Sequence, residues 1–485
     1  MNYAEVAVFV IYLLFMLGIG VYFFVKSKSA GGEKAYFLGG RKMGPFVTAL
    51  SAGASDMSAW VLMGLPTSVY AAGLGKMWIA IGLLIGYTLS WIFEAKRLRN
   101  FSICANDSIT VPQYLTNRFK SSSKLLQIMC AVVFLIAYTI YAASSIKACG
   151  TLFNKVIGLD TTLAMVIAAV VIVSYTFLGG FSAVCWTDFF QGLLILGAML
   201  IAPIFAVSLV DFGEASKLSA DYWNPMASWQ DIVSGLGWGL GYFGMPHIIV
   251  RFMSLRSSKE IKKSGTVAVL WTTFILAFAA IIGIVGRLYL GESEEVVEGS
   301  LVFVNMVRNI FPALMAGLLL SAVLAASMST ADSQLLAASS AFAADVYKPV
   351  IRKEKATDKE MIWAGRVVVL IIAVVAMIIA LNPGAGSIMS MVENAWGLFG
   401  AAFGPVIILS LYWKRMTFAG ASAGIFVGAI VDVLWYALLS SKTGVYEIIP
   451  GFAAGLIATV VISLVSPAPG KDVEKLFDDA LDLKD

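Results

Sequence analysis

Long apolar blocks alternate with short polar connections along almost the whole chain. Each block is about 20 residues long, the length that a helix rising about 1.5 Å per residue needs to cross about 30 Å of hydrocarbon. The pattern predicts an all-α polytopic membrane protein with about 13 transmembrane helices. The predicted spans are roughly residues 6–25, 46–70, 76–93, 125–146, 162–178, 186–210, 232–250, 265–290, 311–346, 362–381, 388–412, 417–439 and 447–466.

The composition agrees with a membrane protein. Of the 485 residues, 59% are hydrophobic and 13% are charged, whereas soluble domains carry about 25% charged residues. The net charge of +4 gives no reason to expect a nucleic-acid partner. The first block follows MNYAE, which lacks basic residues, so we expect a retained helix rather than a signal peptide. The cysteines have no metal-binding spacing and are expected to be free thiols.

Basic residues gather in every second connection between the predicted spans. Most of the 34 lysine and arginine residues lie there, among them Arg41 and Arg251, and the C-terminal tail carries more. Positively charged connections remain on the cytoplasmic side of a membrane. The bias predicts a multi-pass protein of the cell membrane with its N-terminus outside and its C-terminus in the cytoplasm, in agreement with an odd number of crossings.

Two predicted spans carry more glycine and polar residues than a helix in lipid tolerates. Residues 46–70 contain Asp56 together with Gly53, Gly64 and Pro66, and residues 232–250 contain GLGWGLGYFGMPH. In a helix interior glycine costs about 1 kcal/mol and proline about 3 kcal/mol relative to alanine. Backbone groups freed by a break need other partners, so such segments persist where they line a cavity. We expect both spans to be broken helices.

The two broken spans hold corresponding places in two halves of the chain. One begins spans two to six and the other begins spans seven to eleven, and because five is odd the two sets enter the membrane from opposite sides. Paired interrupted helices in inverted halves are typical of secondary transporters with a site at mid-membrane. Glycine-rich spans can also be mere close-packing faces, but a matched pair favours the transporter.

The ninth predicted span places hydroxyl groups at a similar depth to Asp56. Ser329 and Thr330 lie near its middle. Hard cations such as Na⁺ take oxygen ligands from hydroxyl groups and from freed backbone carbonyls. Serine in membrane helices usually donates a hydrogen bond to a carbonyl of its own helix. These hydroxyls therefore indicate a cation site only because they lie beside the predicted break.

Several stretches of the sequence carry a family resemblance. They are LSAGASDMSAWVLMGLP, WGLGYFGMPHIIVRFM, SAVLAASMSTADSQLL, YTFLGGFSAVCWTDFFQ and RMTFAGASAGIFVG. These stretches resemble the sodium:solute symporter family, most closely its proline-carrying members, and the resemblance extends over essentially the whole chain. It implies a LeuT-type 5+5 inverted repeat in a single transporter domain, residues 1–485. The implied parts are an extra N-terminal helix at 6–25, the first repeat at 46–210, the inverted repeat at 232–412, two C-terminal helices at 417–466 and a cytoplasmic tail at 467–485.

The resemblance also implies roles for individual residues. Five would supply Na⁺ ligands, namely the carbonyls of Ala54, Met57 and Ala326 and the hydroxyls of Ser329 and Thr330. Six would contact the substrate: Ser58, Trp60, Tyr141, Trp238, Tyr242 and Pro246. Asp56 and Asp188 would act in cation coupling, and Arg41 would belong to the cytoplasmic gate. Asp56 either ligates the ion directly or acts through its charge on the broken segment.

The sequence departs from its relatives at a few of these positions. Ala59 stands where close relatives have glycine, and Met245 replaces a glutamine whose amide would be able to bond a substrate carboxylate. Asp332 replaces a smaller serine and Ser333 replaces a cysteine. Asp332 either forms a second cation site with Asp188 or faces water.

Two further polar residues have open roles. His247 is either a proton relay or a packed histidine. Asp432 is expected to face protein or the outer interface, because exposure to lipid would be costly.

The predicted function is secondary active transport of L-proline coupled to inward Na⁺ movement by alternating access. The alternatives are another small solute, such as pantothenate or another amino acid, or coupling to H⁺. No GxxxxGK[ST] loop suited to ATP is present. One histidine and scattered cysteines supply neither a nucleophile with its base nor a metal cluster, so an enzyme is not expected. A channel would favour a ring or filter loop over paired broken helices.

Overall fold

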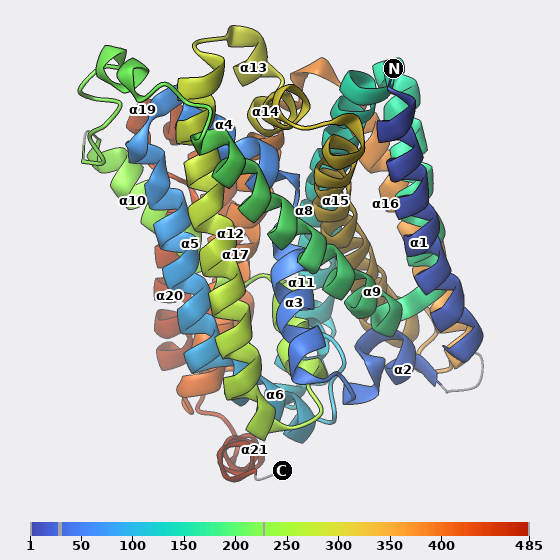
Figure 1. Cartoon of the computed structure of the whole chain (residues 1–485). Coiled ribbons are helices and arrows are strands. Elements are labelled where there is room, and N and C mark those ends of the chain that lie inside the picture. Colours follow the sequence, from blue (N-terminus) through green and yellow to red (C-terminus); the bar gives the residue numbers. More distant parts are fainter. Residues whose placement is uncertain (1, 28–31, 227, 484–485) are drawn as a thin grey trace.

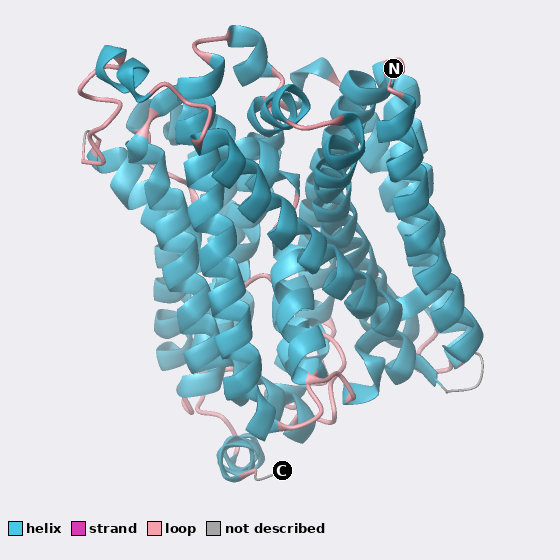
Figure 2. Cartoon of the chain, in the orientation of Figure 1, coloured by secondary structure: helices cyan, strands magenta, loops and turns pink. Residues whose placement is uncertain are grey.

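Helices make up nearly all of the chain in the computed structural model, which describes residues 2–27, 32–226 and 228–483 (Figure 2). Within these ranges no strand forms, and the only β-type pairing is one isolated bridge between Met43 and Leu255. The predicted all-α class is therefore confirmed.

The described residues of the first half of the chain form nine α-helices. Their bounds are α1 Tyr3–Ser27, α2 Gly32–Leu38, α3 Pro45–Asp56, α4 Leu65–Ala72, α5 Met77–Leu89, α6 Ala95–Cys104, α7 Val111–Arg118, α8 Leu125–Ile157 and α9 Thr161–Val207. Short 3-10 or π-helical pieces extend or connect them at Gly39–Arg41, Trp60–Gly64, Leu74–Lys76, Ser90–Glu94 and Phe212–Lys217.

The second half contains twelve more α-helices among the described residues. Their bounds are α10 Trp229–Gly237, α11 Pro246–Ser254, α12 Ile261–Leu290, α13 Glu294–Glu298, α14 Val302–Ile310, α15 Ala313–Ala341, α16 Asp358–Leu381, α17 Ile388–Tyr412, α18 Phe418–Trp435, α19 Ser441–Thr443, α20 Ile448–Val465 and α21 Lys471–Asp482. The short pieces here are η6 Trp238–Phe243, Ser258–Glu260, Phe342–Ile351, Pro383–Ala385 and Tyr436–Ser440.

Ten helical segments of the described chain are long and apolar enough to cross a membrane. A bent pair, Pro45–Asp56 with Trp60–Ala72, raises the number to as many as 11. The predicted spans at 162–178 and 232–250 fail this test because the first is a short apolar helix, Thr161–Ser174, and the second is divided into α10, η6 and α11. The predicted count of 13 is not confirmed by length and composition, although every predicted span overlaps a helix.

The first predicted break lies between α3 and the helical segment that follows it. The two parts meet at an angle of 60°, and Met57 leaves the helical region with φ −79° and ψ 73°. The amide of Ser58 donates to the carbonyl of Asp56 instead of continuing the helical ladder. The sequence SDMS thus ends one helix and leaves its last carbonyls available to other partners.

The second predicted break combines a turn with close packing. Met245 is extended, with φ −81° and ψ 101°, and Pro246 then begins α11, where its missing N–H is not needed. A Cβ on Gly239 would lie 2.4 Å from the carbonyl oxygen of Gly82 in α5. Glycine in η6 therefore also allows the backbones of η6 and α5 to pack closely, as the close-packing alternative predicts.

α9 joins two of the predicted spans into one bent element. Gly180 interrupts it with φ 60°, a conformation that residues with a Cβ rarely adopt. The predicted boundary between residues 178 and 186 falls at this kink.

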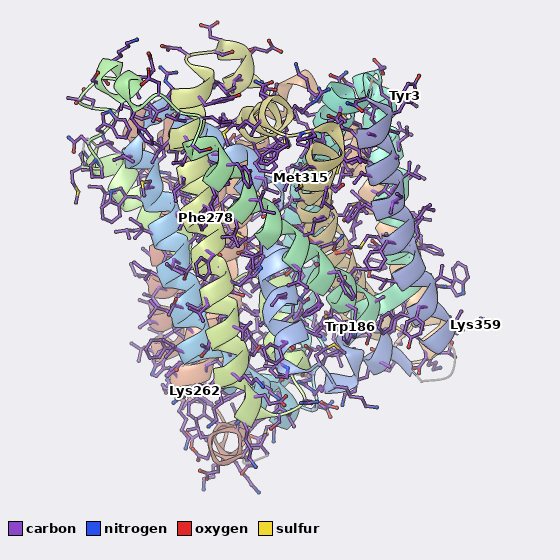
Figure 3. The ribbon with its side chains drawn as sticks, in the orientation of Figure 1. Tyr3, Trp186, Lys262, Phe278, Met315 and Lys359 are labelled. Atoms are coloured by element: carbon purple, nitrogen blue, oxygen red, sulfur yellow. The ribbon has the colours of Figure 1, made fainter. Side chains whose placement is uncertain are left out.

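α15 runs through the middle of the bundle, where it contacts α1, α3, α8 and α9 (Figure 1). Nearly all of its residues are buried, so its serine and threonine side chains face protein. The N- and C-termini lie at opposite ends of the molecule (Figure 1). Lys262 and Lys359 lie in the half of the molecule that carries α21, and Tyr3 lies at the opposite end (Figure 3).

The C-terminal tail forms the amphipathic helix α21, which packs against α6. The ring of Phe477 lies 5.2 Å from that of Phe101, and the guanidinium of Arg118 lies 4.9 Å from the Phe477 ring. Lys414 pairs with Asp478 at 2.7 Å. The predicted tail at 467–485 ends in two residues, 484 and 485, that lie outside the described residues.

Candidate functional site

Asp56 lies at the C-terminal end of α3, where the first helix breaks. Its carboxylate is fully buried. The hydroxyl of Tyr242 in η6 donates to Oδ2 at 2.5 Å, and Oδ1 accepts no hydrogen bond from any described residue. The Asp56 backbone carbonyl accepts hydrogen bonds from Trp60 Nε1 at 3.1 Å and Tyr141 at 3.5 Å. One residue therefore connects both broken helices and α8.

Oxygen atoms from α3 and α15 converge at Ala54, two residues before Asp56. The hydroxyl of Ser329 donates to the Ala54 carbonyl at 2.7 Å and lies 3.2 Å from the Ala326 carbonyl. The hydroxyl of Thr330 is 3.5 Å from the same Ala54 oxygen. Four of the five predicted Na⁺ ligands are thus brought together, and the fifth, Met57, is the capping residue at the end of α3.

The residues present fit a small hard cation. All the converging groups are neutral oxygens, which is the donor set such an ion prefers. The free oxygen of Asp56 supplies a negative charge nearby, and a buried charge with no ionic partner favours an opposite charge beside it.

The predicted substrate residues form an aromatic cluster beside these oxygens. The rings of Trp60 and Trp238 are 6.3 Å apart, and Ser58 lies next to them, with its hydroxyl 3.5 Å from the Trp60 amide. Tyr242 and Tyr141 reach the cluster through Asp56. None of these five side chains is more than 2% exposed. Pro246 lies at the start of α11 and lines a cavity together with Val250, Arg251 and Ser333.

Asp188 of α9 forms a buried ion pair that the sequence did not predict. Arg251 Nη2 is 3.1 Å from Asp188 Oδ2, and the two side chains are 2% and 0% exposed. The hydroxyl of Ser51 also donates to Asp188 Oδ2, at 2.7 Å, and Ser333 Oγ lies 2.5 Å from Arg251 Nη2. The expectation that Arg251 belongs to an aqueous connection is wrong: it lies in the last turn of α11, and the carboxylate of Asp188 compensates its buried charge.

Three polar residues with open roles are all buried. Asp332 is fully buried and its Oδ1 lies 3.3 Å from the hydroxyl of Ser333, which excludes the water-facing alternative in this conformation. His247 is packed, with Nε2 3.1 Å from the Ser55 carbonyl. Asp432 is 3% exposed and faces protein, as one of its two alternatives expected.

Arg41 occupies a crossing point of backbone segments at the α21 end of the bundle. Its guanidinium donates to the Ser102 hydroxyl at 3.0 Å, to the Met253 carbonyl at 2.6 Å and to the Ser108 carbonyl at 2.8 Å. Its Nε donates to Asp107 at 2.8 Å. Burial alone would raise the pKa of Asp107, but Lys34 and Arg41 together hold it below its ordinary value. Arg41 therefore joins the N-terminal half of the chain to α11.

Sequence reasoning missed part of the aromatic cluster. The Tyr87 ring lies 4.8 Å from that of Tyr242, Trp396 lies 5.0 Å from the same ring, and the Tyr446 ring lies 5.1 Å from that of Trp238. Trp396 Nε1 also donates to the Trp238 carbonyl at 2.8 Å. Aromatic residues are frequent in apolar spans, so their sequence positions carried no signal that separates site from core.

The sequence matches one protein family along most of its length. The description "Sodium:solute symporter family" matches residues 36–428. The chain is 42% identical to the osmoregulated proline transporter OpuE of Bacillus subtilis over 476 residues, covering 96% of each chain. It is 41% identical to the sodium/proline symporter of Escherichia coli over 485 residues, covering 97% of this chain and 95% of the relative.

Solved structures show the same fold. A Na⁺-coupled sialic acid symporter in a substrate-bound, outward-open state aligns with a TM-score of 0.79 over 96% of this chain and 99% of that one, at 22% identity. MhsT in complex with L-phenylalanine aligns with a TM-score of 0.55, covering 87% of this chain and 97% of that one, at 14% identity. These likenesses confirm the predicted LeuT-type fold class.

Proposed function

Because the chain belongs to the sodium:solute symporter family, we propose that it couples inward Na⁺ movement to uptake of L-proline by alternating access across the cell membrane. The proteins named as proline transporters among its relatives span almost its whole length. The observation that carries the proposal is the group of α3 and α15 oxygens beside a buried, unpaired carboxylate at a helix break.

Na⁺ is held by the oxygens that now meet across α3 and α15. The carbonyls of Ala54, Met57 and Ala326 and the hydroxyls of Ser329 and Thr330 are the proposed ligands. Ser329 already ties the two helices through the Ala54 carbonyl. An ion coordinated by the Ser329 hydroxyl and the Ala54 carbonyl replaces this hydrogen bond and fixes the end of α3 against α15.

Proline is held by the aromatic cluster and the ends of the broken helices. Trp60 and Trp238 offer apolar faces to the ring and π-electron faces to the cationic amine. The N-terminal ends of half-helices favour a carboxylate, and Pro246 begins such a half-helix. Ser58, Tyr141 and Tyr242 supply the hydroxyl groups of the site.

Coupling follows from the short stretch between Ala54 and Asp56. Ala54 faces the ion-binding oxygens of α15, while Asp56 is held by Tyr242 in η6. An ion that orders this stretch also orders the side of the substrate site formed by Ser58 and Tyr242. Each ligand therefore raises the affinity of the other by the same factor.

The ion gradient supplies enough free energy for accumulation. One Na⁺ moving down about 100 mV contributes about 2.3 kcal/mol, and a tenfold concentration ratio adds about 1.4 kcal/mol. A one-to-one symporter would sustain a proline gradient of about 500-fold on this energy.

Arg41 closes the cytoplasmic side in this account. The distribution of basic residues favours a cytoplasmic location for α21 and an external N-terminus. In that orientation the contacts of Arg41 with Ser102, Ser108 and Met253 lie below the substrate site. They must break for Na⁺ and proline to leave.

Uptake of radiolabelled proline into proteoliposomes tests the proposal. We expect uptake to depend on external Na⁺ and to stop when choline replaces Na⁺ at fixed pH. A proton gradient without Na⁺ serves as the control for H⁺ coupling, and labelled pantothenate serves as the control for another solute. Proline uptake that is unchanged without Na⁺ would refute the coupling ion, and uptake of pantothenate but not proline would refute the substrate.

A further inference from the structure

Two buried carboxyl groups lie beside Gly397 of α17. The chain between them contains α19, which lies at the end of the bundle opposite α21 (Figure 1). Asp432 belongs to α18, and Glu447 directly precedes α20; they are 3% and 2% exposed. A Cβ on Gly397 would lie 3.0 Å from Asp432 Oδ1 and 3.4 Å from Glu447 Cγ. Both side chains thus border the same small space above one glycine.

Neither carboxyl group has a counter-charge among the described residues. Asp432 Oδ1 and Glu447 Oε1 accept no hydrogen bond from the described chain and are fully enclosed. The titratable groups that interact electrostatically with the pair are Glu393 of α17 and Tyr446. Lys76 acts on Glu393 and is itself paired with Asp231 at 2.7 Å. Tyr446 donates its hydroxyl to the backbone carbonyl of Glu393, not to a carboxylate. Two buried like charges cannot both remain ionised without a bound cation.

The environment of Glu447 agrees with this argument. It lies in the connection before α20, outside the membrane-spanning segment. Burial raises the pKa of this carboxyl from 4.5 to about 7, so it exchanges protons within the physiological pH range.

The carboxyl pair is joined to the proposed proline site. Tyr446 is the neighbour of Glu447, and its ring stacks against Trp238 at 5.1 Å. Trp396, the neighbour of Gly397, donates to the Trp238 carbonyl. A change in the separation of α17, α18 and α20 is therefore transmitted to Trp238.

We propose that Asp432 and Glu447 form a proton-binding site that opens to the external side and controls the affinity for proline. The inference rests on the proposed function for its substrate and orientation. A proton from external water binds to one carboxylate, removes the repulsion between the pair and keeps α18 and α20 packed on α17. Loss of this proton at high pH separates the helices and weakens the contact of Trp238 with proline.

The external pH dependence of proline uptake tests this site. At saturating Na⁺ the KM for proline should rise about threefold or more between about pH 6 and about pH 8.5, because one carboxyl of the pair titrates in this range. Glu447→Gln and Asp432→Asn remove the repulsion, so their KM should stay near the low-pH value throughout. Glu298→Gln, an exposed acid of α13 on the same side, is the matched control and should keep the parent dependence.

The infrared carbonyl band of protonated carboxyl groups gives a readout that does not require transport. The band should contain a component that disappears in the parent as pH rises and is absent from Glu447→Gln. Titration with Na⁺ or Ca²⁺ at fixed pH should leave this component unchanged, and its loss would show a metal site instead and overturn the inference. Intact transport with a pH-independent KM in the parent would overturn it as well. Absence of proline transport with an intact titrating band would refute the proposed function but not the proton site.

Discussion

Removal of the Ser329 hydroxyl tests the proposed Na⁺ site most directly. This side chain is fully buried and bridges α15 to the end of α3 through a 2.7 Å hydrogen bond to the Ala54 carbonyl. Ser329→Ala removes one of five proposed oxygen ligands. It leaves the Ala54 oxygen with only the Thr330 hydroxyl, 3.5 Å away.

The expected loss follows from the oxygen ligand that the ion lacks in the bound state. The interaction of a neutral polar group with a charge contributes about 1.5–3 kcal/mol, which corresponds to a factor of about 10–150 in an equilibrium constant. We expect the Na⁺ concentration for half-maximal uptake to rise about 10- to 100-fold. The KM for proline at saturating Na⁺ should change less than about threefold, because the ion then compensates the weaker site.

The assay is proline uptake in proteoliposomes over a series of Na⁺ concentrations at a fixed membrane potential. Ser327→Ala is the matched control, because the same atom is removed from the same buried helix. The Ser327 hydroxyl donates to the Val323 carbonyl of its own helix at 2.9 Å. Equal Na⁺ dependence in Ser329→Ala and the parent would refute the ligand assignment, and an equal shift in both serine variants would show a general effect on α15.

Two other changes have definite expected outcomes. Asp56→Asn keeps the shape of the side chain but removes its charge. Na⁺-driven uptake should fall about 100-fold or more, because the pairing of buried charges contributes several kcal/mol. Normal Na⁺ dependence in this variant would show that the carboxylate has a structural role. Asp107→Asn should weaken the contact with Arg41 and speed hydrogen exchange at residues 105–111. The folded pKa of Asp107 is depressed, so the stabilising contribution of its carboxylate is present above the ordinary value of 3.8 and is lost as pH falls through the lower folded value. An exchange rate at residues 105–111 that is as sensitive to pH near neutrality as in this acidic range would contradict this origin.

The broken helices could be predicted from the sequence because the residues that break them act locally. Proline at position 246 and the glycines around Trp238 disfavour a continuous helix in any surroundings. In the first broken span the glycines and the proline predicted a break but not its position, which the structure places at Met57. The number of complete crossings was less accessible, because a kink such as the one at Gly180 depends on the partner that the chain meets there.

The contacts between segments that are distant in the chain could not be predicted from local sequence. Arg251 follows an apolar span and therefore reads as a cytoplasmic charge, and only the fold shows that Asp188 lies 3.1 Å from it. Likewise, Tyr87 and Trp396 are ordinary aromatic residues of apolar spans until packing turns them toward Tyr242. Family motifs located the proposed ligands and both members of the Asp188–Arg251 pair, but not the contacts that the fold makes between these motifs.

Asp56 is the residue for which the structure narrows the choice left by the sequence. Tyr242 occupies one carboxylate oxygen, and the other receives no hydrogen bond from the described chain. A purely structural acid at a helix break would use both oxygens to hold freed backbone N–H groups, since a buried acceptor without a partner is costly. Here the backbone bonds at the break are made by the carbonyls of Asp56 and Gly53 instead. The free oxygen therefore favours a carboxylate that acts on a cation, with Tyr242 transmitting its state to the substrate side.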